Sequence, residues 1–165
     1  KSFISKFFSP IRKIFWNNDD VHNNLSEHFK RIIYVGHSTA IKSYLTIKEN
    51  LKYWQKIQLG DKEKGGQLEH SLEIFNLTTS SNSPARYLSS GQSRKLALAR
   101  LMLKSASLWL LDEPTVGLDA AGLRSLMTLL NNHCERGGIV VMASHDEVTV
   151  ECPVYILKTD NFKKG

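Results

Sequence analysis

Residues 88 to 119 hold three short motifs in close succession, and they constrain the fold more than any other part of the chain. The first, Leu88-Ser89-Ser90-Gly91-Gln92, is a Ser-Gly turn that opens an Ala- and Leu-rich helical stretch. The second, Leu108-Trp109-Leu110-Leu111-Asp112-Glu113-Pro114, is an apolar strand that ends in two carboxylates. The third, Gly117-Leu118-Asp119, is a turn. The order predicts a helix, a buried strand and a turn, each with polar groups at one end.

These polar groups suit a triphosphate. A Ser-Gly turn at the start of a helix offers hydroxyl and backbone N–H groups to phosphate oxygens. Two carboxylates at the end of a buried strand can hold Mg²⁺ and orient a water molecule. The turn at residues 117–119 can pass between two such sites. Each motif alone is weak, but their order and close spacing favour a nucleotide site over a purely structural role.

Apolar strands alternate with helices along the rest of the chain, which predicts an α/β fold around a mostly parallel sheet. A capping box begins a helix at Thr46, and residues 46 to about 90 hold helices without strands. We therefore expect one domain, residues 1–165, with a core of 1–45 and 105–165 and a helical lobe of about 46–104. The expected strands are 31–35, 108–111 and 139–143, with an edge strand at 154–157, and the expected helices include 3–8, 92–104 and 123–135, the last capped by Gly137-Gly138.

Composition excludes some classes of function. The net charge of +6 is spread over lysines in predicted helices and loops, so a solvated surface is favoured over a nucleic-acid interface. Two cysteines, Cys134 and Cys152, are too few for a disulfide framework and lack metal-ligand spacing, which fits a reducing compartment. No apolar run approaches the roughly 18–20 residues that span a bilayer. Any membrane contact is therefore expected to involve a partner.

The chain begins with Lys1-Ser2 and an apolar helical segment, and it has no complete G-x-x-x-x-G-K-[ST] loop. We interpret Lys1 and Ser2 as the last two residues of such a phosphate-binding loop, in a sequence that is truncated at its N-terminus. The alternative is a chance match of two residues. If the interpretation is right, this piece alone binds ATP poorly and is weak or inactive as an ATPase.

The run from residue 88 to residue 119 resembles the signature motif, Walker B motif and D-loop of the ABC-type ATPases. This resemblance implies a P-loop NTPase-like fold, a partial ABC ATPase domain with a helical signature lobe, and ATP and Mg²⁺ as cofactors. Asp112 and Ser2 would hold Mg²⁺, and Glu113 would orient or deprotonate the attacking water. His145, in Ser144-His145-Asp146 after the strand at 139–143, is similar to the family's switch histidine, which contacts the γ-phosphate.

The resemblance also implies a second ATPase domain, packed head to tail, so that each signature motif closes the other domain's site. Lys1, Ser2 and His37 would then serve the ATP of their own chain. The residues that would face the ATP of the second domain are Ser89, Ser90, Gly91, Gln92 and Asp119.

Residues 34–51 and 88–101 are similar to the CcmA family, the ATP-binding subunits of haem export in cytochrome c maturation. His37 stands where most ABC ATPases carry the Gln of the Q-loop, which puts the usual role of that Gln in doubt. The resemblance implies ATP hydrolysis coupled to haem export or delivery, with an integral membrane subunit of the cytochrome c maturation complex as partner. It implies a peripheral position on an inner membrane, at the cytoplasmic face in bacteria or the matrix face in mitochondria.

Several alternatives stay open. The chain could serve another cargo, be a non-catalytic subunit with a degraded nucleotide site, or belong to the soluble ABC ATPases that act on nucleic acid or ribosomes. Intact Asp112, Glu113 and His145 argue against decay, and the short chain argues against the third class. Gly36-His37-Ser38-Thr39-Ala40 also looks like the nucleophile elbow of an α/β-hydrolase. That elbow needs a helix that starts at the serine, and the next helix start is expected at Thr46.

Overall fold

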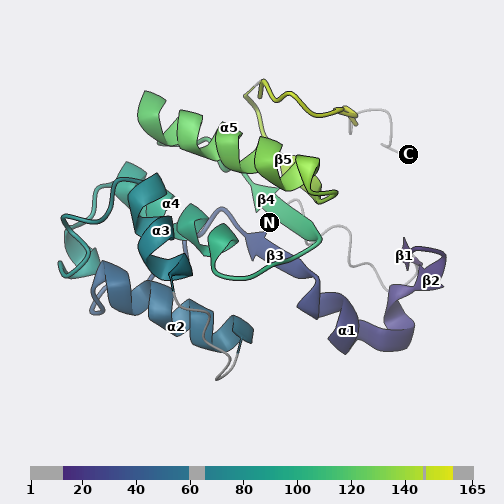
Figure 1. Ribbon diagram of the computed structural model, residues 1–165, viewed down its shortest axis with the longest axis horizontal. Helices are drawn as coiled ribbons and strands as arrows, with labels where there is room; N and C mark the ends of the chain where they lie inside the picture. The colour runs from purple at the N-terminus through teal and green to yellow at the C-terminus, as the bar shows by residue number, and fades with distance from the viewer. Residues whose placement is uncertain (1–12, 60–65, 147, 158–165) are drawn as a thin grey trace, which may run out of the picture.

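The computed structural model describes residues 13–59, 66–146 and 148–157 (Figure 1). Its centre is a parallel three-stranded sheet with the strand order β3-β4-β5. The strands are β3 (Ile32–Val35), β4 (Leu108–Asp112) and β5 (Ile139–Ala143). Helices occupy the connections between these strands, which confirms the α/β prediction.

The register of the sheet explains which side chains are buried. Ile33 pairs with Trp109, and Val35 pairs with Leu111. All four are at most 5% exposed, because alternate residues of a strand point to the same face and helices cover this face. On the opposite face Tyr34 is 41% exposed. The described part of the chain therefore covers one face of the sheet, whereas the sequence predicted buried strands.

Helix α4 (Ser90–Ala99) and the short helix η4 (Arg100–Met102) run through the centre of the hydrophobic core. Four consecutive residues of α4, from Leu96 to Ala99, have no exposed surface. A helix is buried all round when it is surrounded by other elements, here the sheet on one side and two helices on the other. The sequence predicted one helix over 92–104, but the last turn tightens to 3₁₀ geometry and ends at Met102.

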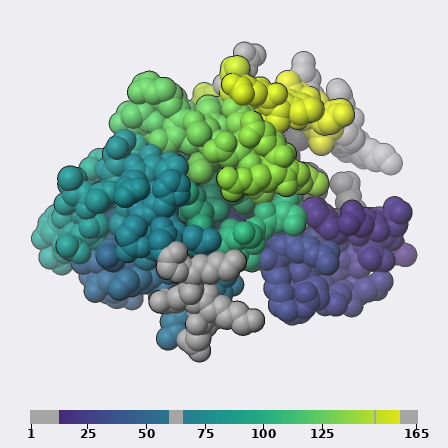
Figure 2. All heavy atoms as spheres, in the orientation of Figure 1, coloured from purple at the N-terminus to yellow at the C-terminus, as the bar shows by residue number. Residues whose placement is uncertain are grey.

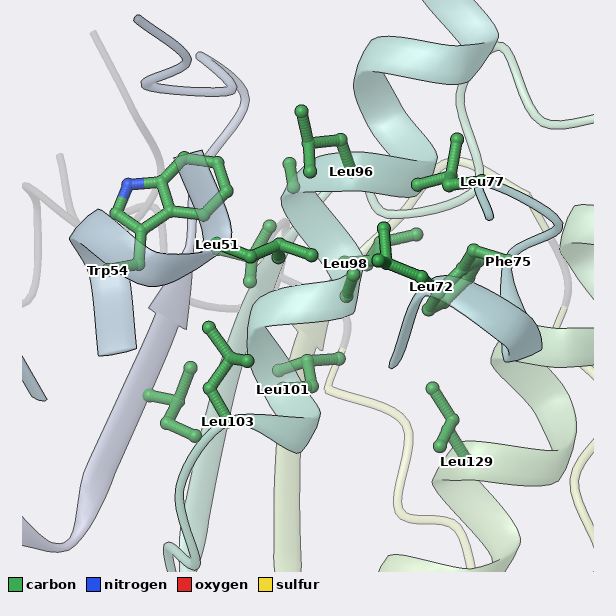
Figure 3. Packing of buried hydrophobic residues seen from close by; sticks show 14 of the residues in the cluster. Leu51, Trp54, Leu72, Phe75, Leu77, Leu96, Leu98, Leu101, Leu103 and Leu129 are labelled. Atoms are coloured by element: carbon green, nitrogen blue, oxygen red, sulfur yellow. The ribbon is translucent and has the colours of Figure 1, made fainter. Parts of the chain in front are cut away.

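Helices α2 (Ile47–Leu59) and α3 (Gln67–Ile74) pack on the side of α4 that is turned away from the sheet (Figure 1). The expected capping box begins α2. The hydroxyl of Thr46 accepts from the backbone N–H of Glu49 at 3.1 Å, and the Glu49 carboxylate accepts from the N–H of Thr46 at 2.7 Å. Figure 3 shows leucines of α2, α3 and α4 meeting in one apolar layer. The short helix η3 (Ala85–Tyr87) leads from this layer into the Ser-Gly turn.

Helix α5 (Ala120–Glu135) crosses above the sheet and begins three residues earlier than 123, the start that the sequence predicted. Its N-cap is Asp119, whose carboxylate accepts from the N–H of Gly122 at 2.7 Å. Its C-terminal end confirms the expected glycine cap. Gly137 has a φ of +80° and donates to the carbonyl of Cys134 at 2.8 Å.

The N-terminal part of the described chain is a small hairpin followed by a short helix. Asn17 and Asn18 both have positive φ and form the turn between two short strands. The sequence indicated only a polar, turn-rich stretch here. The elements are β1 (Phe15–Trp16), β2 (Asp19–Asp20), η2 (Val21–Asn24) and α1 (Leu25–Lys30).

The prediction of an edge strand at 154–157 is wrong. No strand among the described residues pairs with this segment, and its four side chains are 58% to 91% exposed. It is instead the exposed end of an irregular stretch, 148–157, whose residues 151–153 lie next to α5 (Figures 1 and 2). The predicted helix at 3–8 lies outside the described residues. Within the described ranges, no helix combines the length and apolar composition needed to cross a bilayer.

Candidate functional site

The parallel sheet brings three polar segments to one edge. Because β3, β4 and β5 run in the same direction, their C-terminal ends lie side by side, and Asp112 pairs in register with Ala143. His37 follows β3, Glu113 follows β4, and His145 follows β5. This edge is where open α/β sheets bind ligands.

The two carboxylates at the end of β4 have different environments. Asp112 is the last residue of the strand and is 6% exposed. Glu113 lies in the left-handed region with a φ of 50°, and its N–H donates to the carbonyl of Ala143 at 2.8 Å. A left-handed backbone costs a residue with a side chain about 1–2 kcal/mol, and such strain is concentrated at functional sites. The bend turns the Glu113 side chain toward the end of β5.

His145 is the partner of Glu113 at this edge. Its backbone N–H donates to Glu113 Oε2 at 3.4 Å, and its Nε2 lies 3.4 Å from Oε1 of the same carboxylate. The His145 side chain is 96% exposed, whereas that of Glu113 is 18% exposed. The imidazole is therefore free to turn into solvent, while the carboxylate is held. Thr115 joins the same two loops, since its hydroxyl donates to the Asp146 carboxylate at 2.8 Å.

Arg94 was not singled out by the sequence, yet it ties α4 to this edge. Its Nη1 donates to the carbonyl of Gly36 and its Nη2 to that of His37, both at 3.0 Å. The side chain is buried at 5% exposure. Burial lowers the pKa of Arg94, and the nearby carboxylates of Asp112 and Glu113 act in the opposite direction. A sequence signal existed: Arg94 precedes the apolar run that begins at Leu96, where an arginine needs partners.

His37 is positioned through its backbone. Its carbonyl is held by Arg94, and its residue is exposed at the end of β3. The chain from Gly36 to Thr46 contains no helix, and α2 starts at Ile47. A nucleophile elbow needs a helix directly after its serine, so the hydrolase alternative at residues 36–40 lacks its structural basis.

The Ser-Gly turn at 89–92 caps α4. Ser89 Oγ accepts from the N–H of Gln92 at 3.2 Å, and Gln92 Oε1 accepts from the N–H of Ser89 at 3.0 Å. This capping box holds the first turn of α4 in a fixed shape. Ser90 is exposed beside it, and its hydroxyl and the helix N-terminus face solvent. Such an end attracts anions.

The Ser-Gly turn and the turn at 117–119 are in direct contact. A Cβ atom on Gly91 would lie 2.5 Å from the carbonyl oxygen of Gly117, so only glycine allows this approach. Lys95 Nζ lies 2.8 Å from Asp119 Oδ1, which joins α4 to the start of α5 a second time. A hydrogen bond from Lys95 and one from the Gly122 N–H lower the pKa of Asp119.

The expected site residues thus fall into two groups. Asp112, Glu113 and His145 gather at the sheet edge with the backbone of His37. Ser89, Ser90, Gly91 and Gln92 form one structure with Asp119. The described residues hold no group of three or more His, Cys, Asp or Glu side chains suited to a metal ion. Mg²⁺ is commonly held by one or two carboxylates with phosphate oxygens and water, so a buried strand-end Asp fits that mode. Lys1 and Ser2 lie outside the described residues.

A family model described as ABC transporter matches residues 2–116. The "Cytochrome c biogenesis ATP-binding export protein CcmA" of Bordetella bronchiseptica is 42% identical over 130 residues, 79% of this chain and 58% of that protein. The protein of the same name from Haemophilus ducreyi is 36% identical over 151 residues, which are 92% of this chain and 71% of that protein. The chain spans 58% of the first of these two relatives and thus covers only part of it.

Solved structures agree on the fold. An ATP-binding subunit of an ABC transporter superposes with a TM-score of 0.69 at 22% identity, over 78% of this chain and 54% of that one. A dimeric ATP-binding cassette in a post-hydrolysis state, bound to ADP and Pi, also has a TM-score of 0.69, at 23% identity, over 81% of this chain and 62% of that one.

Proposed function

Because this chain belongs to the ABC transporter family, and within it to the CcmA group, we propose that it supplies the ATP-hydrolysing subunit of an export complex. The observation that carries the proposal is the sheet edge, where Asp112, Glu113 and His145 come together from two adjacent parallel strands. The activity, cargo and partners proposed here concern the whole protein, of which this chain resembles a part.

Each residue at the edge has a role that its position supports. Asp112, buried at the strand end, would hold Mg²⁺ when ATP is bound, and the ion would neutralise charge on the phosphates. Glu113 would accept a hydrogen bond from the attacking water and orient it, or take its proton. A fixed carboxylate suits this task, since phosphoryl transfer depends mainly on positioning.

His145 would contact the γ-phosphate. In the structure its Nε2 is instead 3.4 Å from Glu113, and its side chain is almost fully exposed. Because this side chain is exposed, we infer that the imidazole turns toward the γ-phosphate when ATP binds. The Glu113 carboxylate has two oxygens, so it can also accept a hydrogen bond from the attacking water.

The second group of residues would act on the ATP of another ATPase domain. The Ser89 and Ser90 turn would offer its N–H groups and hydroxyls to that phosphate, with Gly91 and Gln92 shaping the turn. Asp119 would lie at the boundary between the two domains. The contact of Gly91 with Gly117 supports this role, because it makes the two turns move as one body. Lys1, Ser2 and His37 would complete the site of their own chain.

The proposed partner and cargo are inferred from the names of the relatives. We propose an integral membrane subunit of the cytochrome c maturation complex as partner, with haem export or delivery as the coupled step. The chain would then be peripheral on an inner membrane, at the cytoplasmic face in a bacterium or the matrix face in a mitochondrion. The names of the matched proteins support this, as they describe ATP-binding export proteins of cytochrome c biogenesis.

The test uses a chimera in which the N-terminal part of a CcmA relative, ending in its phosphate-loop glycines, precedes Lys1. We expect Mg²⁺-dependent ATP hydrolysis that falls at least about a hundredfold in Glu113→Gln, because the positioned base is lost. The variant should still bind ATP. The matched control is Glu135→Gln, which removes an exposed carboxylate from the far end of α5.

Hydrolysis that survives Glu113→Gln unchanged would contradict the role of this residue. A chimera that binds ATP but never hydrolyses it would favour a non-catalytic subunit. For the cargo, deletion of the gene should remove covalently bound haem from c-type cytochromes, and normal levels would refute the haem assignment.

A further inference from the structure

The two cysteines of the chain meet outside the nucleotide site. Cys134 lies on the last turn of α5, and Cys152 lies on the irregular stretch 148–157. Both are partly buried, and both line one surface pocket of about 380 Å³ between the helix and the stretch. The two residues are distant in the sequence, so their meeting is a product of the fold.

A polar contact next to the cysteines fixes this arrangement. The N–H of Glu151 donates to Asn131 Oδ1 at 3.0 Å. Asn131 and Cys134 are three residues apart and share one face of α5. The clamp therefore brings Cys152, the residue after Glu151, to the pocket that Cys134 also lines. Figure 1 shows the stretch passing alongside α5.

The side chains around the two cysteines argue against a metal site. Glu135 and Glu151 line the same pocket, but in the part of the chain that the structure describes these carboxylates and the thiols do not form a metal-binding group of three. Structural zinc sites use four protein ligands. Two thiols that line one pocket can also form a bond between their sulfurs.

We propose that Cys134 and Cys152 are a reversible disulfide site, oxidised by a low-molecular-weight disulfide such as glutathione disulfide. The bond would fasten the stretch 148–157 to α5. It would also close a covalent loop that contains β5 and His145, so the oxidation state of the pair bears on the segment that carries the histidine. The assignment of the pair does not depend on the proposed ATPase activity.

The exchange takes place in two steps. The Cys152 thiolate attacks one sulfur of glutathione disulfide, which forms a mixed disulfide and releases one glutathione thiolate. The Cys134 thiolate then attacks the Cys152 sulfur and releases the second glutathione. Two electrons pass from the protein to the oxidant, and both thiol protons end on glutathione or in solvent.

The order of attack follows from the environment of Cys134. Burial, and then the hydrogen bond to Cys152, raise the pKa of the Cys134 thiol to about 11. This thiol is protonated at neutral pH and is a poor nucleophile for a dissolved disulfide. It can still resolve a mixed disulfide held against it, and this second step should become faster as the pH rises toward that pKa.

The test equilibrates the 165-residue chain with glutathione buffers and measures intact mass and non-reduced peptide maps. We expect loss of two hydrogens and a cross-linked peptide pair. The equilibrium constant should be at least about tenfold larger in the folded chain than in the urea-unfolded chain, because native contacts raise the effective concentration of one thiol at the other. In initial-rate measurements, Cys134→Ser should take up glutathione on Cys152 faster than Cys152→Ser takes it up on Cys134.

Asn131→Ala keeps both thiols but removes the hydrogen bond from Glu151, so it should lower the equilibrium constant for disulfide formation in the folded chain. The matched control is Asn132→Ala, whose side chain lies on the exposed face of the same turn. Two results would overturn the proposal. One is a wild-type chain that gains glutathione on its cysteines without an internal bond. The other is an equal constant in the folded and unfolded chains.

Discussion

Replacing Arg94 with methionine tests how the core helix is joined to the sheet edge. The change keeps most of the aliphatic volume and removes the guanidinium, with its two 3.0 Å bonds to the carbonyls of Gly36 and His37. The carbonyl of His37 can be rehydrated, because that residue is exposed. Gly36 is buried, and its carbonyl is left without a donor.

The expected loss of stability follows from these environments. A buried acceptor without a partner costs about 1–3 kcal/mol, and a hydrogen bond to a charged group contributes about 1.5–3 kcal/mol. The gain from no longer burying the Arg94 charge offsets part of this. We therefore expect Arg94→Met to lower the free energy of unfolding by about 2 kcal/mol.

Urea unfolding followed by tryptophan fluorescence measures this loss, and hydrogen exchange should show faster opening of the amides between Gly36 and Thr46. The matched control is Lys95→Met on the next residue of α4. Its partner Asp119 has a side chain that is 62% exposed, so water screens that ion pair and the loss should be clearly smaller. Equal losses in the two variants, or a loss below about 0.5 kcal/mol for Arg94→Met, would refute the reasoning.

Three further predictions concern the packing and the pH dependence of the fold. Gly91→Ala should lower the free energy of unfolding by about 1–3 kcal/mol in thermal or urea unfolding, because its Cβ would meet the Gly117 carbonyl oxygen at 2.5 Å. Ser90→Ala, which changes an exposed side chain at the preceding residue, controls for this and should change stability by less than about 0.5 kcal/mol; equal losses would argue against the contact. The His133 ring stacks on Trp109 with the ring centroids 3.8 Å apart, and burial lowers the pKa of His133 below 6.5. As the pH falls, this histidine therefore takes up a proton in the unfolded chain before it does so in the folded chain. The stability that is present above pH 6.5 is lost as the pH falls below that value. His133→Phe should flatten this part of the pH profile of urea unfolding, and an unchanged profile would assign it to other groups. Leu98→Ala should cost about 2–5 kcal/mol, whereas Ile156→Ala, 81% exposed, should stay within about 0.5 kcal/mol; a large effect of the second would revive a packed strand at 154–157.

Sequence patterns predicted the elements that are stabilised by interactions between residues close in the sequence. The capping box at Thr46 and the glycine cap at Gly137 appear as expected, because each depends on bonds within a few residues. The strands that contain Leu111 and Val140 were also predicted, since short apolar runs bounded by polar turns identify buried strands. The predictions failed where a neighbour was needed: residues 154–157 have the composition of a strand, but in the part of the chain that the structure describes no strand pairs with them.

The sequence by itself determined the chemistry of the candidate site, because the order of Ser-Gly turn, strand-end carboxylates and turn is written in consecutive residues. Only the tertiary structure decided which groups meet. The guanidinium of Arg94 reaches the end of β3, and Gly91 touches Gly117, because parallel strands and a central helix bring distant segments together. Cys134 and Cys152 line one pocket for the same reason. Such contacts depend on how helices pack on the sheet, which no periodicity within one segment records.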